Sequence, residues 1–369
     1  MTETTDILVI GGGIAGISAA AELAQDASVT VLESEAQLGY HSTGRSAAIF
    51  IRNYGNDTLR GLNDLSHPAL SGDLLGESVL SPRGEMLVVQ DHELDTLASY
   101  LEGTANVERL SAAEAVALVP ILRRDKIAAA VIERDAQDID VDRLLQGCAR
   151  LLRARGGTVR TGQTIAAISK DGDGWRVETG DDVYSAKIVI NAAGAWADPV
   201  AKLAGLAPMG IQPMRRSAVL MAVPEDVGPI AHWPLFGSVV EGEGWYAKPD
   251  GNRLMISPAD EDPVDPGDAW PDDMVLAEGL YRFEQMVDLP IVKPSHSWAG
   301  LRSFAPDRTP VVGFDPDASG FFWLAGQGGY GVQTAPALAA IVRALCTGGG
   351  DGAAKLELTQ ALSPARLRF

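Results

Sequence analysis

The chain has 369 residues, a length that predicts two or three domains of about 150 residues each. It has 30 Lys and Arg against 49 Asp and Glu, giving a formal net charge of −19. This acidity argues against nucleic acid or an anionic membrane surface as a partner, because both need clustered positive charge. Cys148 and Cys346 are the two cysteines, and no histidine spacing suits a metal, so we expect neither a disulfide scaffold nor a metal site.

No apolar run is long enough to cross a membrane, and the first residues lack the basic and apolar pattern of an export signal. We therefore expect no transmembrane segment and a cytoplasmic location.

The first 33 residues have the pattern of one βαβ unit. The apolar run Asp6–Ile10 predicts a buried parallel strand, and it leads directly into the glycine-rich segment Gly11–Gly16. Residues 17–25 are rich in alanine and predict a helix with small side chains against the sheet. A second β-branched strand is expected over Ser28–Leu32.

The glycine spacing in this unit predicts a dinucleotide site. Gly11 permits a tight turn, Gly13 lets the backbone approach a pyrophosphate, and Gly16 lets the helix pack closely on the strand. The helix N-terminus offers N–H groups to the phosphates. Glu33, at the end of the second strand, can accept the ribose hydroxyls and would repel a 2′-phosphate, so the pattern predicts FAD or NAD and not NADP.

The same order of strand, glycine-rich loop and helix occurs again near the other end of the chain. The strand Phe321–Ala325 leads into Gly326–Gly331 and a predicted helix over 332–345. A strand, a glycine loop and a helix at both ends indicate one discontinuous domain with a second domain inserted. The expected cofactor-binding domain spans 1–78, 135–212 and 295–369, and the expected substrate-binding domain spans 79–134 and 213–294.

Between these ends the pattern predicts a mixture of elements. Small residues at 46–48 predict the start of a helix, and 140–155 an amphipathic helix. Residues 214–291 carry Asp-Gly and Glu-Gly turn signals and predict an antiparallel sheet. Further strands are expected at 85–89, 157–161, 165–169, 175–179 and 187–191.

Two glycine-containing segments favour FAD over NAD. Residues 191–196 (NAAGAW) end a strand in small residues, which allows another segment to cross close to a dinucleotide. The segment Gly326–Gly331 opens the last helix, whose N-terminus can face the flavin edge that becomes negative on reduction. An NAD enzyme has no need of this additional glycine site.

The motifs GGGIAG with Glu33, HSTGRSAA, NAAGAW, SWAGLRSF and GQGGYGVQT occur in an order that resembles the D-amino-acid oxidase and glycine oxidase family. Within it, GYHSTGRSAA, QPMRRSA, WAGLRSF and QGGYGVQT together look most similar to bacterial D-arginine dehydrogenases. The resemblance implies an α/β fold in which a Rossmann-like FAD domain carries an inserted substrate domain built on an antiparallel sheet. It also implies noncovalent FAD, since neither cysteine lies in a flavin-attachment motif.

The glycine pattern and the resemblance together predict which residues of this chain bind the cofactor. They are Gly11, Gly13, Ile14, Ala15, Gly16, Glu33, Ser34, Ser42, Thr43, Gly44, Arg45, Ser46, Ala47, Ala48, Ile165, Ala193, Gly194, Trp196, Gly328, Gly329, Tyr330, Gly331, Val332 and Gln333.

The substrate side follows from charge and from the resemblance. An amino acid needs its carboxylate held, and the planar fork of arginine does this with two hydrogen bonds. The resemblance assigns this clamp to Arg302, with Arg216 as a second positive group. It further assigns Tyr54 and Tyr246 to the substrate site and the carbonyl of Gly329 to the substrate amine.

Two features of the sequence disagree about the substrate side chain. Glu85 matches the acid that pairs with a basic side chain in relatives. Ile49 and Phe50 replace a histidine and a tyrosine of relatives, which predicts a more apolar wall. Basic and hydrophobic D-amino acids both remain candidates.

The expected reaction is oxidative deamination by hydride transfer from Cα to flavin N5, giving a 2-oxo acid and ammonia. One alternative is an oxidase for glycine, sarcosine or another N-methyl amino acid, and a second is a non-catalytic FAD-binding subunit. The residues leave the electron acceptor open among a quinone, an electron carrier and oxygen.

Overall fold

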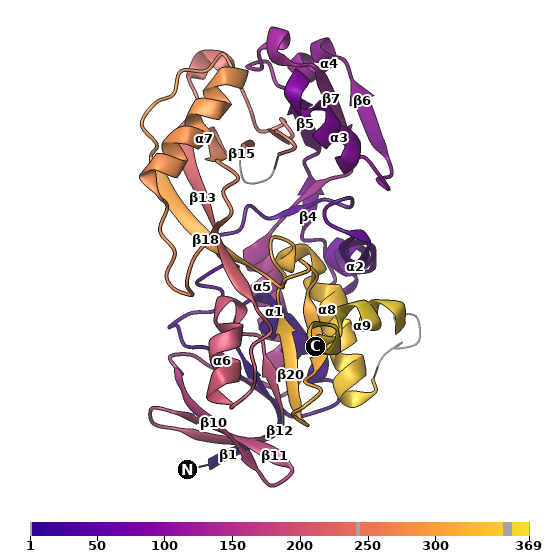
Figure 1. Cartoon of the computed structure of the whole chain (residues 1–369), viewed down its shortest axis with the longest axis vertical. Helices are drawn as coiled ribbons and strands as arrows, with labels where there is room; N and C mark the ends of the chain where they lie inside the picture. Colours follow the sequence, from indigo (N-terminus) through magenta and orange to yellow (C-terminus); the bar gives the residue numbers. More distant parts are fainter. Residues whose placement is uncertain (1, 241–243, 350–355, 369) are drawn as a thin grey trace.

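The structure, a computed structural model, describes residues 2–240, 244–349 and 356–368. Figure 1 shows a lower part that contains both ends of the chain and an upper part formed by its middle. Among the described residues, no helix is long and apolar enough to cross a membrane.

Within these residues, eight strands form the sheet of the lower part, in the order β10-β11-β12-β1-β2-β9, with β20 beside β12 and β19 beside β20. The strands are β1 (Thr2–Ile10), β2 (Val29–Leu32), β9 (Thr158–Arg160), β10 (Ile165–Asp171), β11 (Gly174–Thr179), β12 (Val183–Asn191), β19 (Val311–Phe314) and β20 (Phe321–Ala325). β1 runs parallel to both β12 and β2, as the predicted βαβ unit requires. The carboxyl ends of β1, β12 and β20 therefore meet at one edge of the sheet.

Helices α1 (Ile14–Leu23), α5 (Val141–Ala154) and α8 (Gly331–Thr347) pack together in the lower part. The face of α1 toward its neighbours is mostly alanine and isoleucine, and these side chains are buried. Small side chains let α1 approach α8 closely, so the first and last helices of the predicted cofactor domain share one core.

The upper part is built on a second sheet, with nine strands among the described residues. They are β5 (Glu85–Val89), β6 (Val107–Leu110), β7 (Ala129–Glu133), β13 (Gln212–Ala222), β14 (Leu235–Gly237), β15 (Tyr246–Asp250), β16 (Arg253–Ser257), β17 (Asp262–Pro263) and β18 (His296–Phe304). Its pairs are antiparallel except that β5 and β14 run parallel, so the predicted antiparallel sheet is in fact mixed.

β13 and β18 are the long strands that join the two parts (Figure 1). They pair antiparallel from Gln212 opposite Phe304 to Leu220 opposite His296. The expected boundary at residue 295 assigns β18 to the cofactor domain, whereas its backbone belongs to the second sheet. This strand thus brings its side chains to the junction.

Apart from short 3-10 and π-helical turns, the remaining described elements are a small sheet and six α-helices. The sheet contains β3 (Ile49–Phe50), β4 (Leu80–Pro82) and β8 (Gln137–Ile139), and the helices are α2 (Asp57–Pro68), α3 (Leu94–Tyr100), α4 (Ala112–Leu118), α6 (Ala197–Leu203), α7 (Asp273–Met286) and α9 (Leu356–Leu362).

Two local predictions are wrong. The helix expected to open at Ser46–Ala48 is absent; this segment is irregular, Ala48 has φ +47°, and β3 follows. Residues 214–291 are not all sheet, because they contain the 14-residue helix α7. The Asp272 side chain caps that helix by accepting from the backbone N–H groups of Met274 and Val275.

Candidate functional site

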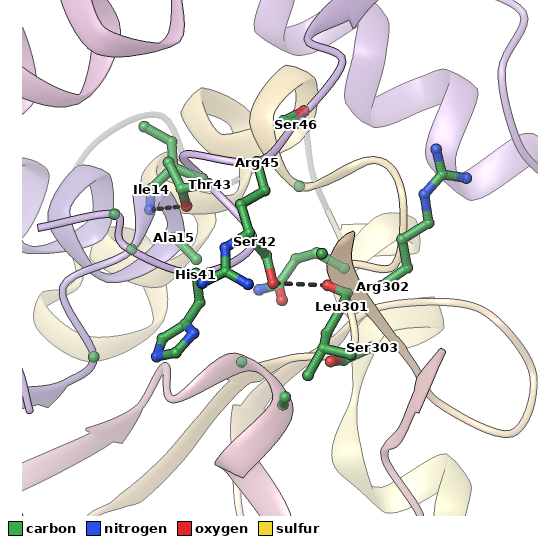
Figure 2. A pocket seen from close by; sticks show the side chains of 18 of the residues that line it. Ile14, Ala15, His41, Ser42, Thr43, Arg45, Ser46, Leu301, Arg302 and Ser303 are labelled. Carbon is green, nitrogen blue, oxygen red and sulfur yellow. Dashed lines mark hydrogen bonds between the residues drawn. The ribbon is translucent and has the colours of Figure 1, made fainter. Parts of the chain in front are cut away.

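One cavity runs from the glycine loop after β1 to the β13–β18 junction (Figure 2). It combines residues that lie far apart in the chain, from Ile10 to Gln333. Of the predicted cofactor residues, the following line it: Gly11, Gly13, Ile14, Ala15, Glu33, Ser34, Ser42, Thr43, Arg45, Ser46, Ala47, Ala48, Ile165, Ala193, Gly194, Trp196, Gly328, Gly329, Gly331, Val332 and Gln333.

The glycine loop is shaped by two close backbone approaches. Gly11 has φ +114°, and a Cβ built on it would lie 2.3 Å from the carbonyl oxygen of Ala192. A Cβ on Gly16 would lie 2.0 Å from the carbonyl oxygen of Gly11. Only glycine fits at either position, so the N-terminus of α1 is held at the cavity wall. Gly16 acts from behind this wall and does not line the cavity.

The loop after β2 closes over the start of α1. The hydroxyl of Thr43 accepts a hydrogen bond of 3.1 Å from the backbone N–H of Ile14 (Figure 2). Ser42 donates to the carbonyl of Leu301 at 2.7 Å, which ties this loop to β18. Gly44 lies in the same loop but outside the cavity lining.

Glu33 lies at the end of β2, as predicted, and is 9% exposed. One carboxylate oxygen accepts from the backbone N–H of Gly12 at 2.6 Å, and the other accepts from that of Glu35 at 2.8 Å. These bonds fix the carboxylate at the cavity wall, with lone pairs remaining for ribose hydroxyls.

The Arg45 side chain connects the loop to the second sheet. Its guanidinium donates to the carbonyls of Ala269 and Ala299 at 3.1 and 3.0 Å and pairs with Asp268. The indole of Trp298 donates back to the Arg45 carbonyl at 3.2 Å. Arg45 lines the cavity, but its guanidinium is already hydrogen-bonded and ion-paired in contacts that join the two parts of the molecule.

Gln333 and Tyr330 have structural partners near the start of α8. The Gln333 amide exchanges hydrogen bonds with Ile51 and donates to Asn63 Oδ1 at 2.7 Å, all of them buried. Tyr330 is 6% exposed and lies outside the cavity lining, with its ring centroid 4.6 Å from that of Tyr54. Both residues therefore position the loop that opens α8.

Five of the six predicted substrate residues lie together at one end of the cavity: Tyr54, Arg216, Tyr246, Arg302 and Gly329. Arg302 Nη1 donates to the hydroxyl of Tyr54 at 3.2 Å. A Cβ built on Gly329 would lie 3.0 Å from the guanidinium carbon of Arg302, so the glycine backbone lies directly against this cation.

Arg216 approaches the same end from β13 but is held by acidic partners. Its guanidinium donates to the Asp260 carbonyl at 2.7 Å and pairs with Glu261 at 3.2 Å. Tyr246 lies near both arginines: burial raises the pKa of its phenol, but the charges of Arg302 and Arg216 outweigh this and leave that pKa below its ordinary value.

The sixth residue, Glu85, does not line the cavity. It faces Glu133 across β5 and β7, and it interacts with Tyr100. Phe50 also lies elsewhere: it is 1% exposed, buried in the core of the lower part, so the expectation that it lines the substrate wall is wrong. Ile49 does line the cavity, as do the apolar side chains of Ala218 and Met255.

Sequence reasoning missed several lining residues. His41 pairs with Glu35 at 2.9 Å, and its ring packs on Trp196 with centroids 4.6 Å apart. His41, Ser303 and Gln327 lie within the HSTGRSAA, SWAGLRSF and GQGGYGVQT motifs, so their positions were available, whereas Met255 carries no local signal that distinguishes it from core residues.

The geometry suits a flavin dinucleotide. A glycine cradle and a helix N-terminus face the cavity at one end, Glu33 lies beside them, and a second helix N-terminus faces it at the start of α8. A pyrophosphate and a ribose suit the first set, and the electron-accepting ring suits the second.

Comparisons with known proteins also indicate an FAD-binding protein. The profile of the FAD dependent oxidoreductase family matches residues 6–345. A glycerol 3-phosphate dehydrogenase of Caloramator mitchellensis is 26% identical over 356 residues, covering 91% of this chain and 72% of the relative. A glycine oxidase of Pseudomonas putida is 26% identical over 359 residues, covering 93% and 94%.

The fold is shared with an L-proline dehydrogenase from P. horikoshii, with a TM-score of 0.84, 23% identity, and coverage of 99% of this chain and 98% of that one. Because the family match extends over most of the sequence and the cavity supplies the matching cradle, the chain belongs to the FAD dependent oxidoreductase family and is an FAD-containing oxidoreductase.

Proposed function

We propose that the protein catalyses FAD-dependent oxidative deamination of D-amino acids, in which the substrate is oxidised to an imino acid that water hydrolyses to a 2-oxo acid and ammonia. The observation that carries this proposal is the cluster of Arg302, Tyr54, Tyr246 and the Gly329 backbone at one end of the cofactor cavity. The similarity to a glycine oxidase supports an amino acid as the substrate class. The D configuration rests on the motif resemblance.

In this proposal Arg302 binds the substrate carboxylate through two parallel hydrogen bonds. Arg216 adds positive charge, although its pairing with Glu261 offsets part of it. The carbonyl of Gly329 accepts from the substrate amine, which must be neutral for its lone pair to assist loss of the hydride. Holding the carboxylate and the amine orients the Cα–H bond, and such orientation can lower the activation free energy by several kcal/mol.

Bound FAD supplies the hydride acceptor. The protein's own part is to bind and orient the substrate, and this requires no side chain to remove the Cα proton. Tyr246, close to both arginines, donates to the carboxylate while its phenol is protonated.

Hydrophobic side chains are the first substrate candidates, because the apolar side chains of Ile49, Ala218 and Met255 line the same cavity as the clamp. Basic side chains are the second candidates, because the acid pair Glu85 and Glu133 could bind a cation. Tyr100 links this pair to the substrate end of the cavity, since it interacts electrostatically with both Glu85 and Tyr54. The pair lies outside the cavity lining, so a long side chain is needed to reach it.

Anaerobic mixing with pairs of D- and L-amino acids, glycine and sarcosine tests the proposal. Bleaching of the oxidised flavin absorbance by D-methionine, D-leucine or D-arginine, and not by the L forms, supports it. Faster bleaching by glycine or sarcosine favours an oxidase for these small substrates. The absence of bleaching by any amine contradicts catalysis and favours an FAD-binding subunit.

A further inference from the structure

Two buried polar atoms of cavity-lining residues have no hydrogen-bond partner within the described chain. They are the hydroxyl oxygen of Ser303 and the side-chain nitrogen Nε2 of Gln327. Ser303 is 7% exposed, and both residues line the cofactor cavity. Buried polar groups in folded proteins are almost always hydrogen-bonded, so two such atoms facing one cavity indicate a ligand that supplies the partners.

The two side chains come from neighbouring backbone segments. The N–H of Gly328 donates to the carbonyl of Ser303 at 2.8 Å, and Phe304 forms an isolated bridge with Gln327. Gln327 also packs on the start of α8, since a Cβ on Gly331 would lie 3.3 Å from its Cβ. One rigid corner of the fold therefore presents both groups.

This corner is not the substrate site. Arg302 leaves β18 on the side opposite Leu301 and Ser303 (Figure 2), as alternation along a strand requires. The carbonyl of Leu301 accepts from Ser42, in the loop that covers the N-terminus of α1. Ser303 therefore lies on the face of β18 opposite Arg302, beside the loop that opens α8, whose Gly328 N–H donates to the Ser303 carbonyl.

The chemistry of the pair selects the part of FAD that it contacts. The Gln327 Nε2 group donates only, whereas the Ser303 hydroxyl both donates and accepts. The ligand must therefore offer an acceptor oxygen to Gln327 and either an acceptor or a donor to Ser303. We infer that Ser303 and Gln327 form a hydrogen-bonding subsite for the flavin half of FAD, through its ribityl hydroxyls and ring carbonyls. The ADP half is placed at the opposite end, by Glu33 and the glycine loop.

FAD affinity of the holoenzyme tests this inference without relying on activity. Ser303→Ala and Gln327→Met remove the polar atoms and nearly keep the volume. Dilution of each holoenzyme, followed by flavin fluorescence, should give an FAD Kd raised roughly tenfold per variant, as expected for loss of one buried hydrogen bond. Ser297→Ala is the matched control, because Ser297 lies on the same strand and is exposed.

Competition by ADP separates a flavin contact from general damage to the cavity. At a fixed saturating concentration of FAD, the ADP concentration that displaces half of the flavin depends on the ratio of the two affinities. It should fall by roughly the factor by which the FAD Kd rises. An unchanged FAD Kd, or a half-displacing ADP concentration that stays constant while the FAD Kd rises, overturns the inference.

Discussion

Glu85 of β5 and Glu133 of β7 lie directly opposite each other in the second sheet. Burial, together with the charge of Glu133, raises the pKa of Glu85 to about 8, against a hydrogen bond from Tyr100 that lowers it. Glu133 is 3% exposed, and burial raises its pKa too, although bonds from Asn53 and Arg52 oppose this. Near neutral pH the pair therefore retains a proton that a cationic ligand would displace.

If this pair binds a basic side chain, Glu85→Gln should lower kcat/KM for D-arginine by roughly tenfold or more, the scale of one charged hydrogen bond. Efficiency for D-methionine should hardly change, since its side chain contacts the apolar residues that line the cavity. Steady-state kinetics on both substrates checks this. Equal effects on the two substrates would show that Glu85 is a structural acid.

The same pair makes stability depend on pH. Because the folded pKa of Glu85 lies above its unfolded value, its contribution to stability is fully present below the unfolded pKa and is lost as pH rises toward about 8. Glu85→Gln removes this loss. The difference in Tm, variant minus wild type, should therefore be more positive at about pH 8.5 than at about pH 5.5. A difference that is constant with pH would place the Glu85 pKa near its ordinary value.

Arg302→Ala should retain FAD and lose activity. Removing a charged contact to a desolvated carboxylate costs roughly 2–5 kcal/mol, which is about 30-fold or more in kcat/KM. Flavin content and steady-state kinetics measure the two effects, and Arg253→Ala, at a more exposed ion pair, serves as the control. A loss below about threefold would mean that another group holds the carboxylate.

Gly16→Ala should destabilise the protein and weaken FAD binding, because the new methyl group would lie 2.0 Å from the Gly11 carbonyl oxygen. Such overpacking costs roughly 1–3 kcal/mol or more. Gly180→Ala is the control, since nothing lies within 4 Å of a Cβ there. Thermal unfolding and the ratio of flavin to protein absorbance report both effects, and equal behaviour of the two variants would refute the close approach.

Acid or heat denaturation should release intact FAD into the supernatant. The burial of Cys148, which raises its thiol pKa to about 12, makes that cysteine unreactive, and neither cysteine lines the cavity. Chromatography of the supernatant checks this. Flavin that stays with the precipitated polypeptide would demonstrate covalent attachment.

Local sequence rules predicted the cofactor half of the molecule well. The glycine spacing, the apolar run before it and the acid after β2 act within one βαβ unit, so short-range steric and hydrogen-bonding rules determine them. The helix α7 was missed although its cap, Asp272, was present, because nearby turn residues favoured strands. Ser303 and Gln327 lie in motifs that the sequence marked, but their buried, unpartnered atoms could not be predicted, since these arise only after long-range packing.

The cavity wall extends from Ile10 to Gln333, so segments near both ends of the chain are needed to form it. During synthesis, α1 and the glycine loop leave the ribosome long before β18 and α8, which complete the site. FAD can therefore be captured only after nearly all of the chain has emerged, and shortened translation products lacking α8 should not carry flavin. Yellow colour in a preparation thus reports polypeptide that includes α8 and has assembled the cavity.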